Sequence, residues 1–488
     1  MLLQDILKNV SVLDSKGSLD IDISNIQYDS RKVEKNSLFI CIKGFNVDGH
    51  KFINSAIEKG ATAFLIEDDI DTHYIEGITF IKVNNTRKTM ATISCNFNNN
   101  PSQNELSILG VTGTNGKTSI TTFLREILNS NGDKSGLVGT IAINTGDRVI
   151  ESKSTTPESL ELQGYFREMI DSDCKYCAME VSSHSLDLNR VDNTEFKIGV
   201  FTNLTPDHLD YHKNLDEYRK AKEKLFYKTT VANIINIDDN GGVCIYENIK
   251  NIDTPCYTYA IDKDADFMAK DVILTSSGVQ YTLVTPTCST EVFVPVPGKF
   301  TVYNTLAVIA TCYLLNIPMD TIVSSLKNTH GVSGRFESIK NNKDITVIVD
   351  YAHTPDALEN VLTTIKGFAQ NDIITVFGCG GDRDSSKRPM MGKISQDLSD
   401  YTIITNDNPR TENPQNIIND ILDGLDKENN NYVVIEDREL AIKHAIEYAK
   451  KGDVVLIAGK GHENYQILGT TKHHFDDKEI AIKYLDMI

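Results

Sequence analysis

The sequence predicts an α/β protein made of three domains in a row. Its 488 residues are the length of about three ordinary domains. Short apolar runs alternate with amphipathic runs of helical period along most of the chain, which is typical of layered α/β folds. A polar, Pro-containing stretch at 98–105 and a glycine-rich stretch at 331–335 interrupt this alternation. We therefore expect domains at 1–100, 101–333 and 334–488.

The first block is expected to be a small α/β domain. Ser37–Lys43 and Ala61–Ile66 are typical of strands, and the apolar positions from Phe52 to Ile57 indicate a helix between them. Tyr28–Arg31 and Gly44–His50 have the composition of turns. Taken alone, these segments do not indicate a function.

The second block opens with a strand, a glycine-rich loop and a helix. Ile108, Leu109 and Val111 predict a buried strand, and an apolar stripe from Ile120 to Leu128 predicts the helix. The loop between them consists of Gly113, Thr114, Asn115, Gly116, Lys117, Thr118 and Ser119. Such a loop directs backbone N–H groups and the positive end of a helix dipole toward a phosphate. Lys117 can reach terminal phosphates and the Thr118 hydroxyl can ligate Mg²⁺, so we expect a nucleotide site; an ordinary glycine-rich turn is the alternative.

Two later strands are expected to bring metal ligands toward this loop. Cys177–Val181 carries Glu180 to its carboxyl end, and Lys197–Thr202 leads into a loop that contains His208. Ligands bind at the carboxyl ends of strands in parallel-sheet enzymes, and a carboxylate with an imidazole suits a divalent cation. A capping or surface role for His208 is an equal alternative. Lys222, on a charged helix, is by itself expected to be solvated.

The third block alternates strand and helix throughout, which predicts a Rossmann-like, doubly wound parallel sheet. Before it, alternating residues from Gly278 to Pro297 predict antiparallel edge strands on the second block. The strand ends of the third block carry the polar segments Asp350–His353, Gly378–Asp384, Asp407–Arg410 and Gly459–Glu463. The Gly378 loop does not fit a dinucleotide fingerprint, because Arg383 stands where the third glycine is required.

Composition narrows the classes of function. A net charge of −19 argues against a general nucleic-acid binder. The sequence has neither a long apolar run nor a signal-peptide pattern, so we expect no membrane insertion. The nine cysteines are scattered, and the pair Cys174 and Cys177 lacks a second pair that would complete a zinc site. These features favour reduced thiols and a cytoplasmic protein.

With these segments placed, the chain resembles the Mur ligases of bacterial cell-wall synthesis. The resemblance covers nearly the whole chain, and its motifs occur in family order. They are GTNGKT at 113–118, EVSSH at 180–184, DHLDYH at 207–212, AKEKLF at 221–226, GRFE at 334–337, DYAHTPD at 350–356, GDRD at 381–384, DNPR at 407–410 and GKGHE at 459–463.

The resemblance implies an ATP-dependent ligase that forms an amide bond through an acyl phosphate. Its substrates would be a UDP-linked muramoyl dipeptide and the amino acid added next, and its catalytic residues Lys117, Glu180, His208 and Lys222. Mg²⁺ would be bound by Thr118, Glu180, His208 and Lys222, with Lys222 carrying a carbamate derived from CO₂. ATP would also contact Asn304, Arg335 and Asp350 across a domain interface. We expect a monomer.

The resemblance also implies residues for the two other substrates. The UDP-linked dipeptide would be held by Tyr28, Ser30, Phe45, Asn46, Val47, Ser154, Thr155, Thr156, Ser182 and Arg190. The incoming amino acid would be held by Arg383, Asp407, Asn408, Pro409, Arg410, Gly459 and Glu463. Leu188 and Ser154 stand where relatives often have Gln and Asn, so details of the dipeptide pocket are left open.

Arg410 indicates which amino acid is added. A guanidinium pairs bidentately with a carboxylate, and meso-diaminopimelate has a carboxylate beyond its side-chain amine, which L-lysine lacks. The DNPR segment also resembles the family members that add meso-diaminopimelate, so this is the expected substrate. The alternatives are the same ligase using L-lysine, an amide ligase like folylpolyglutamate synthase, a P-loop phosphotransferase and a nucleotide-gated binding protein.

Overall fold

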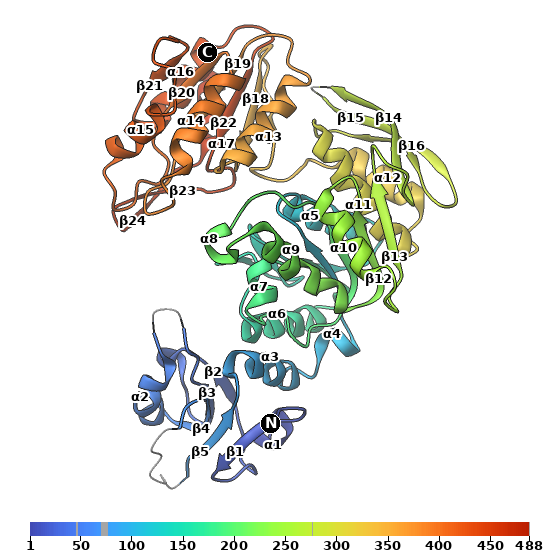
Figure 1. Ribbon diagram of the computed structural model, residues 1–488, viewed down its shortest axis with the longest axis vertical. Coiled ribbons are helices and arrows are strands. Elements are labelled where there is room, and N and C mark those ends of the chain that lie inside the picture. Colours follow the sequence, from blue (N-terminus) through green and yellow to red (C-terminus); the bar gives the residue numbers. More distant parts are fainter. Residues whose placement is uncertain (45–46, 70–76, 276, 488) are drawn as a thin grey trace. The chain divides into compact units, whose positions relative to one another are not determined.

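The computed structural model describes residues 1–487 apart from 45–46, 70–76 and 276. It divides into two compact units, Met1–Thr258 and Tyr259–Ile488, which are described separately below. Figure 1 shows their helices and strands. Among the described residues, no helix is both long enough and apolar enough to cross a membrane.

The first unit begins with a five-stranded sheet of order β1-β5-β4-β3-β2. Strands β2 to β5 are parallel to their neighbours, and β1 runs antiparallel to β5. The strands are β1 Val12–Lys16, β2 Asn25–Gln27, β3 Ser37–Ile40, β4 Ala61–Ile66 and β5 Thr79–Val83. The helices are α1 Leu3–Ile6, η1 Ser30–Lys32, η2 Gly49–Phe52, α2 Ile53–Glu58 and α3 Thr86–Phe97. The expected strands and the helix between them are present, although β3 ends earlier, at Ile40.

The polar stretch at 98–105 is partly helical. It contains the short helix α4, Pro101–Asn104, which begins with a proline at its first position. Proline suits that position because the first turn of a helix has no intrahelical partner for its N–H groups. Asn100 has a φ of 53°, in the left-handed region that asparagine tolerates, and turns the chain into α4.

The central sheet of the first unit is built around β6, Ser107–Thr112. Parallel β10, Tyr176–Glu180, and β11, Phe196–Phe201, lie on its two sides. The register aligns Glu180 with Val111 and Phe201 with Thr112. The carboxyl ends of these neighbouring strands therefore meet at one edge of the sheet.

Further elements complete this sheet and its cover. They are β7 Ser135–Val138, β8 Ala142–Asn144, β9 Val149–Glu151, β12 Thr229–Asn236, α5 Lys117–Ser130, α6 Ser159–Asp171, α7 Ser183–Asp187, α8 Leu209–His212, α9 Leu215–Glu223, η3 Lys224–Tyr227 and α10 Asn240–Ile249. Strand β7 pairs with β10 in parallel, whereas β8 and β9 form an antiparallel extension. Cys177 lies within β10 and is fully buried, as expected for a thiol packed in a strand.

The second unit starts with an antiparallel meander. The meander consists of β14 Phe267–Thr275, β15 Gly278–Val284 and β16 Ser289–Val294, and β14 pairs in parallel with β13, Cys256–Ala260. Helices α11, Lys299–Leu314, and α12, Met319–Asn328, follow. The antiparallel strands expected between 278 and 297 are therefore confirmed.

The rest of the second unit is a six-stranded sheet of order β17-β18-β22-β19-β20-β21. Its strands are β17 Glu337–Ile339, β18 Thr346–Asp350, β19 Ile373–Phe377, β20 Tyr401–Ile404, β21 Tyr432–Val434 and β22 Val454–Ala458. All pairs are parallel except β17 with β18. The doubly wound parallel sheet is thus confirmed, with one antiparallel edge strand added.

Helices cover both faces of this sheet (Figure 1). They are α13 Pro355–Lys366, α14 Lys387–Leu398, α15 Pro414–Leu422, α16 Arg438–Tyr448 and α17 Asp477–Met487. One apolar cluster joins the sheet to α13, α14 and α15, and a second joins it to α16 and α17. A hairpin of β23, Tyr465–Leu468, and β24, Thr471–His474, was not expected from the sequence.

Candidate active site

The phosphate loop joins β6 to α5 and has the conformation that the sequence predicts. Gly113 and Gly116 have φ values of 147° and 90°, which favour glycine. A Cβ on Gly113 would lie 1.8 Å from Thr202 Oγ1, because the end of β11 passes beside the loop. Lys117 Nζ donates to the carbonyls of Gly113 (2.9 Å) and Thr114 (2.7 Å). The lysine is therefore folded against its own loop and must turn outward to reach a phosphate.

Lys222 lies under this loop and is almost completely buried. Its Nζ donates to the carbonyl of Gly113 at 2.8 Å and lies 4.2 Å from the centroid of the Tyr218 ring. The expectation of a solvated lysine, drawn from the charged helix alone, is wrong, since only 1% of the residue is exposed. Burial, and then the nearby Lys117 ammonium, lower the pKa of Lys222 well below its usual value. Its amine is thereby biased toward the neutral, nucleophilic form.

Glu180 ends β10 and is buried next to Gly139 and Thr140. Its Oε1 accepts from the backbone N–H of Thr140 at 2.9 Å, and its Oε2 from the Thr140 hydroxyl at 3.0 Å. The same hydroxyl lies 3.1 Å from Thr155 Oγ1. The carboxylate is thus fixed at the strand edge, and oxygen lone pairs remain for a cation.

His208 immediately precedes α8 and has a left-handed conformation, with a φ of 53°. Its side chain is half exposed, and its ring packs edge-to-face on His184 with centroids 4.9 Å apart. His184 follows β10 on α7, so the EVSSH and DHLDYH segments lie next to each other. The buried His212 strengthens this contact, because its Nε2 lies 2.9 Å from Ser183 Oγ.

The residues expected to hold the dipeptide converge beyond Glu180. The Thr156 hydroxyl donates to the carbonyl of Glu180 at 2.8 Å and accepts from the N–H of Ser182 at 3.1 Å. Arg190 Nη1 donates to the Thr156 carbonyl at 3.0 Å. Ser154 Oγ reaches the same carbonyl at 3.2 Å, and Thr155 contacts Thr140 as described above. The structure therefore brings together Ser154, Thr155, Thr156, Ser182 and Arg190.

Of the residues expected to hold the UDP part, Tyr28, Ser30 and Val47 are described, and they lie in segments next to strands β2 and β3 of the five-stranded sheet. Tyr28 follows β2, and its hydroxyl donates to Glu161 Oε1 at 2.7 Å. Burial and this carboxylate raise the pKa of Tyr28 far above its usual value. Ser30 begins η1, and Val47 is exposed. Phe45 and Asn46 lie outside the described residues.

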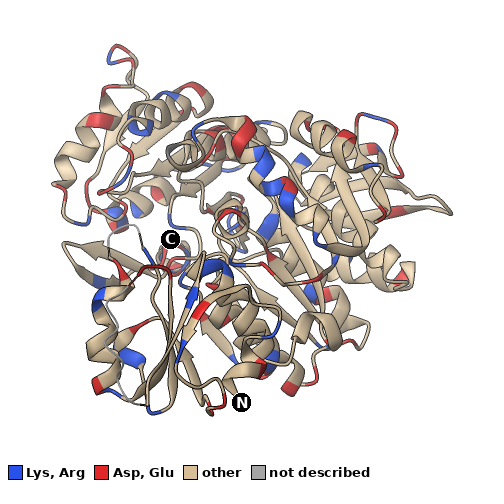
Figure 2. Ribbon diagram, turned by 60° about the horizontal axis from the view of Figure 1, so that its bottom comes forward, with Lys and Arg blue, Asp and Glu red and all other residues tan. Residues whose placement is uncertain are grey.

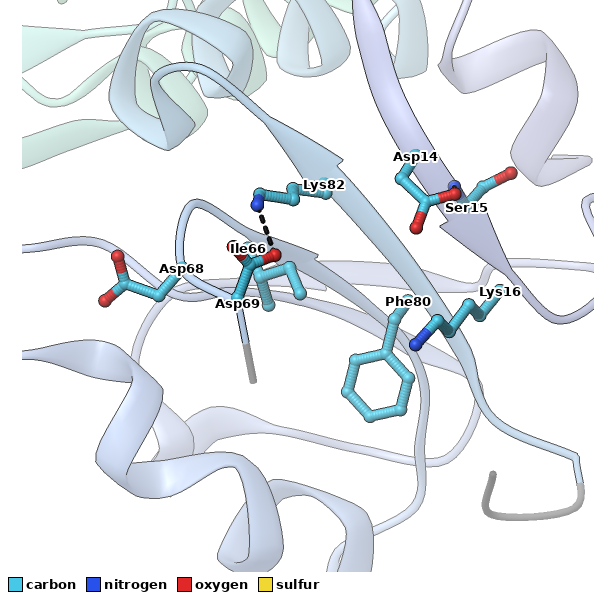
Figure 3. A pocket seen from close by; sticks show the side chains of 8 residues that line it. All are labelled: Asp14, Ser15, Lys16, Ile66, Asp68, Asp69, Phe80 and Lys82. Carbon is cyan, nitrogen blue, oxygen red and sulfur yellow. Dashed lines mark hydrogen bonds and ion pairs between the residues drawn. The ribbon is translucent and has the colours of Figure 1, made fainter. Parts of the chain in front are cut away.

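Two other features of this sheet do not belong to the expected site. Figure 3 shows a surface hollow lined by Asp14, Ser15, Lys16, Ile66, Asp68, Asp69, Phe80 and Lys82, in which Lys82 pairs with Asp69. Asp48, His50 and Asp68 also lie close enough together to hold a cation. However, His50 Nδ1 lies 2.6 Å from Asp48 Oδ1 and its Nε2 accepts from the N–H of Glu67, so both ring nitrogens are engaged within the protein.

In the second unit, Asp350 and Arg335 form the group expected to contact ATP. Asp350 ends β18 and accepts from the N–H groups of Phe336 (2.6 Å) and Ala352 (2.7 Å). Burial raises the pKa of the Asp350 carboxyl, and Arg335 partly opposes this shift. The Arg335 guanidinium lies over the Tyr351 ring at 4.6 Å. Asn304 is buried on α11.

The residues expected to hold the amino acid gather at the ends of β20 and β22. Asn408 Nδ2 donates to Glu463 Oε2 at 2.9 Å. Asp407 lies beside Gly459, where an added Cβ would come within 3.0 Å of Asp407 Oδ2. Pro409 is buried between these residues and Arg410.

Arg410 is held by the neighbouring loop and by the β23–β24 hairpin. Its Nη1 donates to the carbonyl of Gly381 at 2.7 Å, and its backbone N–H donates to the carbonyl of Ile467 at 3.1 Å. Arg410 has a φ of 52°, an uncommon value for a residue other than glycine. Arg383 is exposed on the loop that receives Arg410. A guanidinium has further N–H donors besides the one on Nη1, and these can pair with a carboxylate.

Several polar residues of these sites were not identified from the sequence. They are His184, His212, Arg388, Arg438 and Lys460. Arg388, Arg438 and Lys460 are fully buried or nearly so. The sequence shows that these residues lie inside the motifs or at the starts of expected helices. It does not show that the cations are buried, because burial depends on partners distant in sequence.

Charges of both signs are interspersed over helices and loops (Figure 2).

Three family models match successive parts of the chain. They describe the Mur ligase family catalytic domain at residues 22–98, the Mur ligase middle domain at 111–312 and the Mur ligase glutamate ligase domain at 334–461.

Individual relatives match the chain from end to end. The chain is 63% identical over 481 residues to the UDP-N-acetylmuramoyl-L-alanyl-D-glutamate--2,6-diaminopimelate ligase of Clostridioides difficile (strain 630), covering 99% of each chain. Its identity to the ligase of the same name from Alkaliphilus metalliredigens is 51%, covering 99% of this chain and 97% of the relative. A solved structure of a ligase of that name is similar with a TM-score of 0.72 at 30% identity, covering 100% of this chain and 99% of the other.

Proposed function

The chain belongs to the Mur ligase family, and we propose that it joins meso-2,6-diaminopimelate to UDP-N-acetylmuramoyl-L-alanyl-D-glutamate. ATP drives this reaction, and ADP and phosphate are released. The product is the UDP-linked tripeptide used in peptidoglycan synthesis. The observation that carries this proposal is the full-length identity of 63% to a ligase with these substrates. The amino-acid site supports it, because Arg410 and Glu463 offer a guanidinium and a carboxylate to a substrate that bears both charges.

Activation of the dipeptide is assigned to the first unit. A carboxylate is a poor acyl donor, so the γ-phosphoryl group of ATP is transferred to the D-glutamyl carboxylate to form an acyl phosphate. Backbone N–H groups of the loop from Gly113 to Thr118 hold the phosphates, and Lys117 neutralises charge on the transferring group. Thr156, Ser182 and Arg190 hold the dipeptide beside the loop.

The residues near the loop fit a magnesium ion. Thr118 offers a hydroxyl, Glu180 a fixed carboxylate and His208 an imidazole, which are suitable donors for a hard cation. Mg²⁺ bound there would stabilise negative charge on the phosphates during transfer. The protein's own contribution is to hold Glu180 through Thr140 and to hold the His208 loop through His184.

Lys222 is proposed to act as a carbamate. Its neutral amine attacks CO₂: the N–C bond forms, the electron pair of one C–O π bond moves onto oxygen, and the nitrogen releases one proton, so that a neutral amine becomes an anion. The lowered pKa of Lys222 supplies the neutral amine that this step needs. The Gly113 carbonyl and the Tyr218 ring keep the nitrogen in place.

The amine of diaminopimelate then attacks the acyl phosphate, and phosphate leaves the tetrahedral intermediate. Residues Asp407 to Arg410, with Glu463, hold the amino acid in the second unit. Asn304, Arg335 and Asp350 are proposed to contact ATP. We further propose that the enzyme works as a monomer in the cytoplasm, where its nucleotide-linked substrates are made.

Phosphate release measured with each substrate omitted in turn tests this function. We expect release to require ATP, the UDP-linked dipeptide and meso-diaminopimelate together. Release without the amino acid would indicate a phosphatase or phosphotransferase, and release with a folate in place of the dipeptide would indicate a folylpolyglutamate synthase. Binding of ATP without turnover would indicate a nucleotide-gated binding protein.

A further inference from the structure

We propose that Lys460 is a positioning residue of the amino-acid site that sets the preference for meso-diaminopimelate over L-lysine. This inference rests on the proposed function and extends it to a residue with no assigned role. Lys460 follows β22, next to Gly459, and its side chain is completely buried. Burying a charged ammonium is costly unless hydrogen-bonding partners surround it.

The partners of Lys460 are residues expected to hold the amino acid. Its Nζ lies 3.0 Å from Asn408 Oδ1, 3.4 Å from Asp407 Oδ1 and 3.5 Å from Glu463 Oε2. The ring of Tyr465, on the β23–β24 hairpin, has its centroid 5.7 Å from the same nitrogen. The ammonium therefore lies at the centre of the site's own acceptors.

The first consequence concerns the orientation of the Asn408 amide. The two ends of an amide have nearly the same shape, so its hydrogen-bonding partners decide which way it faces. Asn408 Oδ1 accepts from Lys460 Nζ and from the backbone N–H of Ile467 at 2.9 Å. Both donors fix the oxygen on that side, and Nδ2 is left to face Glu463 Oε2 at 2.9 Å. Lys460 thus sets where the site presents a donor.

The second consequence concerns net charge. Asp407 and Glu463 both approach Lys460, so the ammonium compensates one of the two carboxylates. At neutral pH meso-diaminopimelate has no net charge, whereas L-lysine carries one positive charge because it lacks the second carboxylate. A site without Lys460 would be more negative and would favour the net cationic substrate. Selectivity is a difference of two affinities, and Lys460 disfavours the competitor.

Lys460→Met tests both consequences in the full-length enzyme. We expect KM for meso-diaminopimelate to rise at least about tenfold, with KM for ATP and for the dipeptide changed less than about twofold. We also expect the ratio of kcat/KM for diaminopimelate to that for lysine to fall at least about tenfold. Lys460→Arg keeps the charge and should retain this ratio within about threefold, even if KM rises.

Lys478→Met is the matched control, because Lys478 pairs with Glu337 and is about half exposed, outside the acceptors of Lys460. It should leave both the ratio and KM unchanged. An unchanged ratio and an unchanged KM for diaminopimelate in Lys460→Met would overturn the proposal. Inactive wild-type enzyme with diaminopimelate would instead contradict the proposed function.

Asn408→Asp provides a second test that does not depend on the folding of Lys460→Met. The new carboxylate still satisfies Lys460 and Ile467, but it presents an acceptor to Glu463 where Nδ2 was a donor. We expect the same direction of change, with a higher KM for diaminopimelate and a lower selectivity ratio. Unaltered kinetics in a folded Asn408→Asp enzyme would show that the amide orientation does not matter, and would overturn the proposal.

Discussion

Two buried lysines show how the surroundings of a side chain decide its chemistry. Lys222 has one carbonyl and an aromatic ring as partners, and burial, followed by the nearby Lys117 ammonium, lowers its pKa. Lys460 is surrounded by carboxylates and an amide oxygen. We therefore propose that the same side chain reacts with CO₂ in one place and balances charge in the other.

Replacing Lys222 should separate stability from activity. Because the folded state disfavours the protonated amine, unmodified Lys222 destabilises the protein at every pH below the usual lysine pKa of about 10.4, increasingly as pH falls toward the lowered folded-state value. We expect Lys222→Met to abolish ligation, by at least about a thousandfold, and to raise Tm in CO₂-depleted buffer at pH 6. Activity and thermal melting measure the two effects.

Lys224→Met is the control for this experiment. Lys224 lies two residues after Lys222, but its side chain is exposed and pairs with Asp187. It should leave activity and Tm nearly unchanged. A Lys222→Met enzyme that keeps wild-type activity would exclude the carbamate.

Arg410→Ala should weaken the binding of diaminopimelate selectively. Loss of a guanidinium that pairs with a carboxylate in a partly buried site costs about 2 to 5 kcal/mol, which is roughly a thirtyfold to several-thousandfold rise in KM. KM for ATP should stay the same, because Arg410 contacts Gly381 and Ile467 and is not among the residues expected to bind ATP. Steady-state kinetics with each substrate varied in turn provide the measurement, and an unchanged KM for diaminopimelate would refute the assignment.

At the scale of elements, buried side chains fix the conformations of neighbouring loops by forming hydrogen bonds and ion pairs to both of them. Arg388, at the start of α14, donates to the Gly380 carbonyl and pairs with Glu412 (2.9 Å) and Asp420 (2.8 Å). Glu412 in turn accepts from the N–H of Asp382. One buried guanidinium therefore ties the GDRD loop to the segment that follows DNPR.

Arg388→Met should loosen both loops. We expect the free energy of unfolding to fall by about 2 kcal/mol, because Glu412 and Asp420 lose their partner but are partly exposed to water. KM for diaminopimelate should rise more than KM for ATP. Urea denaturation measures the change in the free energy of unfolding. Lys393→Met is the control, because Lys393 forms an exposed pair with Asp397 on the same helix. It should lower the free energy of unfolding by no more than about 0.5 kcal/mol. Equal stability of the two variants would contradict the role of Arg388.

The elements predicted best from the sequence are those whose apolar period is strong and local. Ala61–Ile66, for example, is expected as a strand with the same bounds that the structure gives it. The helix at Pro101–Asn104 was missed because a polar stretch with proline suits both a linker and a helix start. The β23–β24 hairpin was missed because its residues are mostly exposed and show little alternation.

Site residues, too, could be predicted from the sequence only where the signal is local. The phosphate loop could be recognised from its glycines and Lys117, which are contiguous in sequence. The burial of Lys222 could not, because it depends on Gly113, a residue 109 positions away. Lys460 likewise depends on Asn408, 52 positions away. The resemblance to family motifs locates these segments in the sequence. Only the tertiary contacts show which carbonyls, carboxylates and rings surround each lysine ammonium.

At the scale of the whole molecule, stability should decrease in acid. His462 is desolvated beside Arg335, which lowers its pKa to about 4, and its Nδ1 has no hydrogen-bond partner among the described residues. The unfolded chain binds this proton near pH 6.5 and the folded chain only near pH 4, so stability falls as pH drops between these values. His462→Gln should remove up to about 2 kcal/mol of this loss. Urea denaturation at pH 7 and pH 4.5 provides the test; identical pH dependence in both proteins would contradict it.

The central claim is that this ligase adds meso-diaminopimelate to the UDP-linked dipeptide. A competition experiment tests it most directly, with ATP, the dipeptide and equal concentrations of meso-diaminopimelate and L-lysine, followed by mass analysis of the UDP-linked product. Arg410, Glu463 and Lys460 together predict a product that contains diaminopimelate in excess of lysine by at least about a hundredfold. A lysyl product in equal or greater amount, or no UDP-linked tripeptide, would contradict the claim.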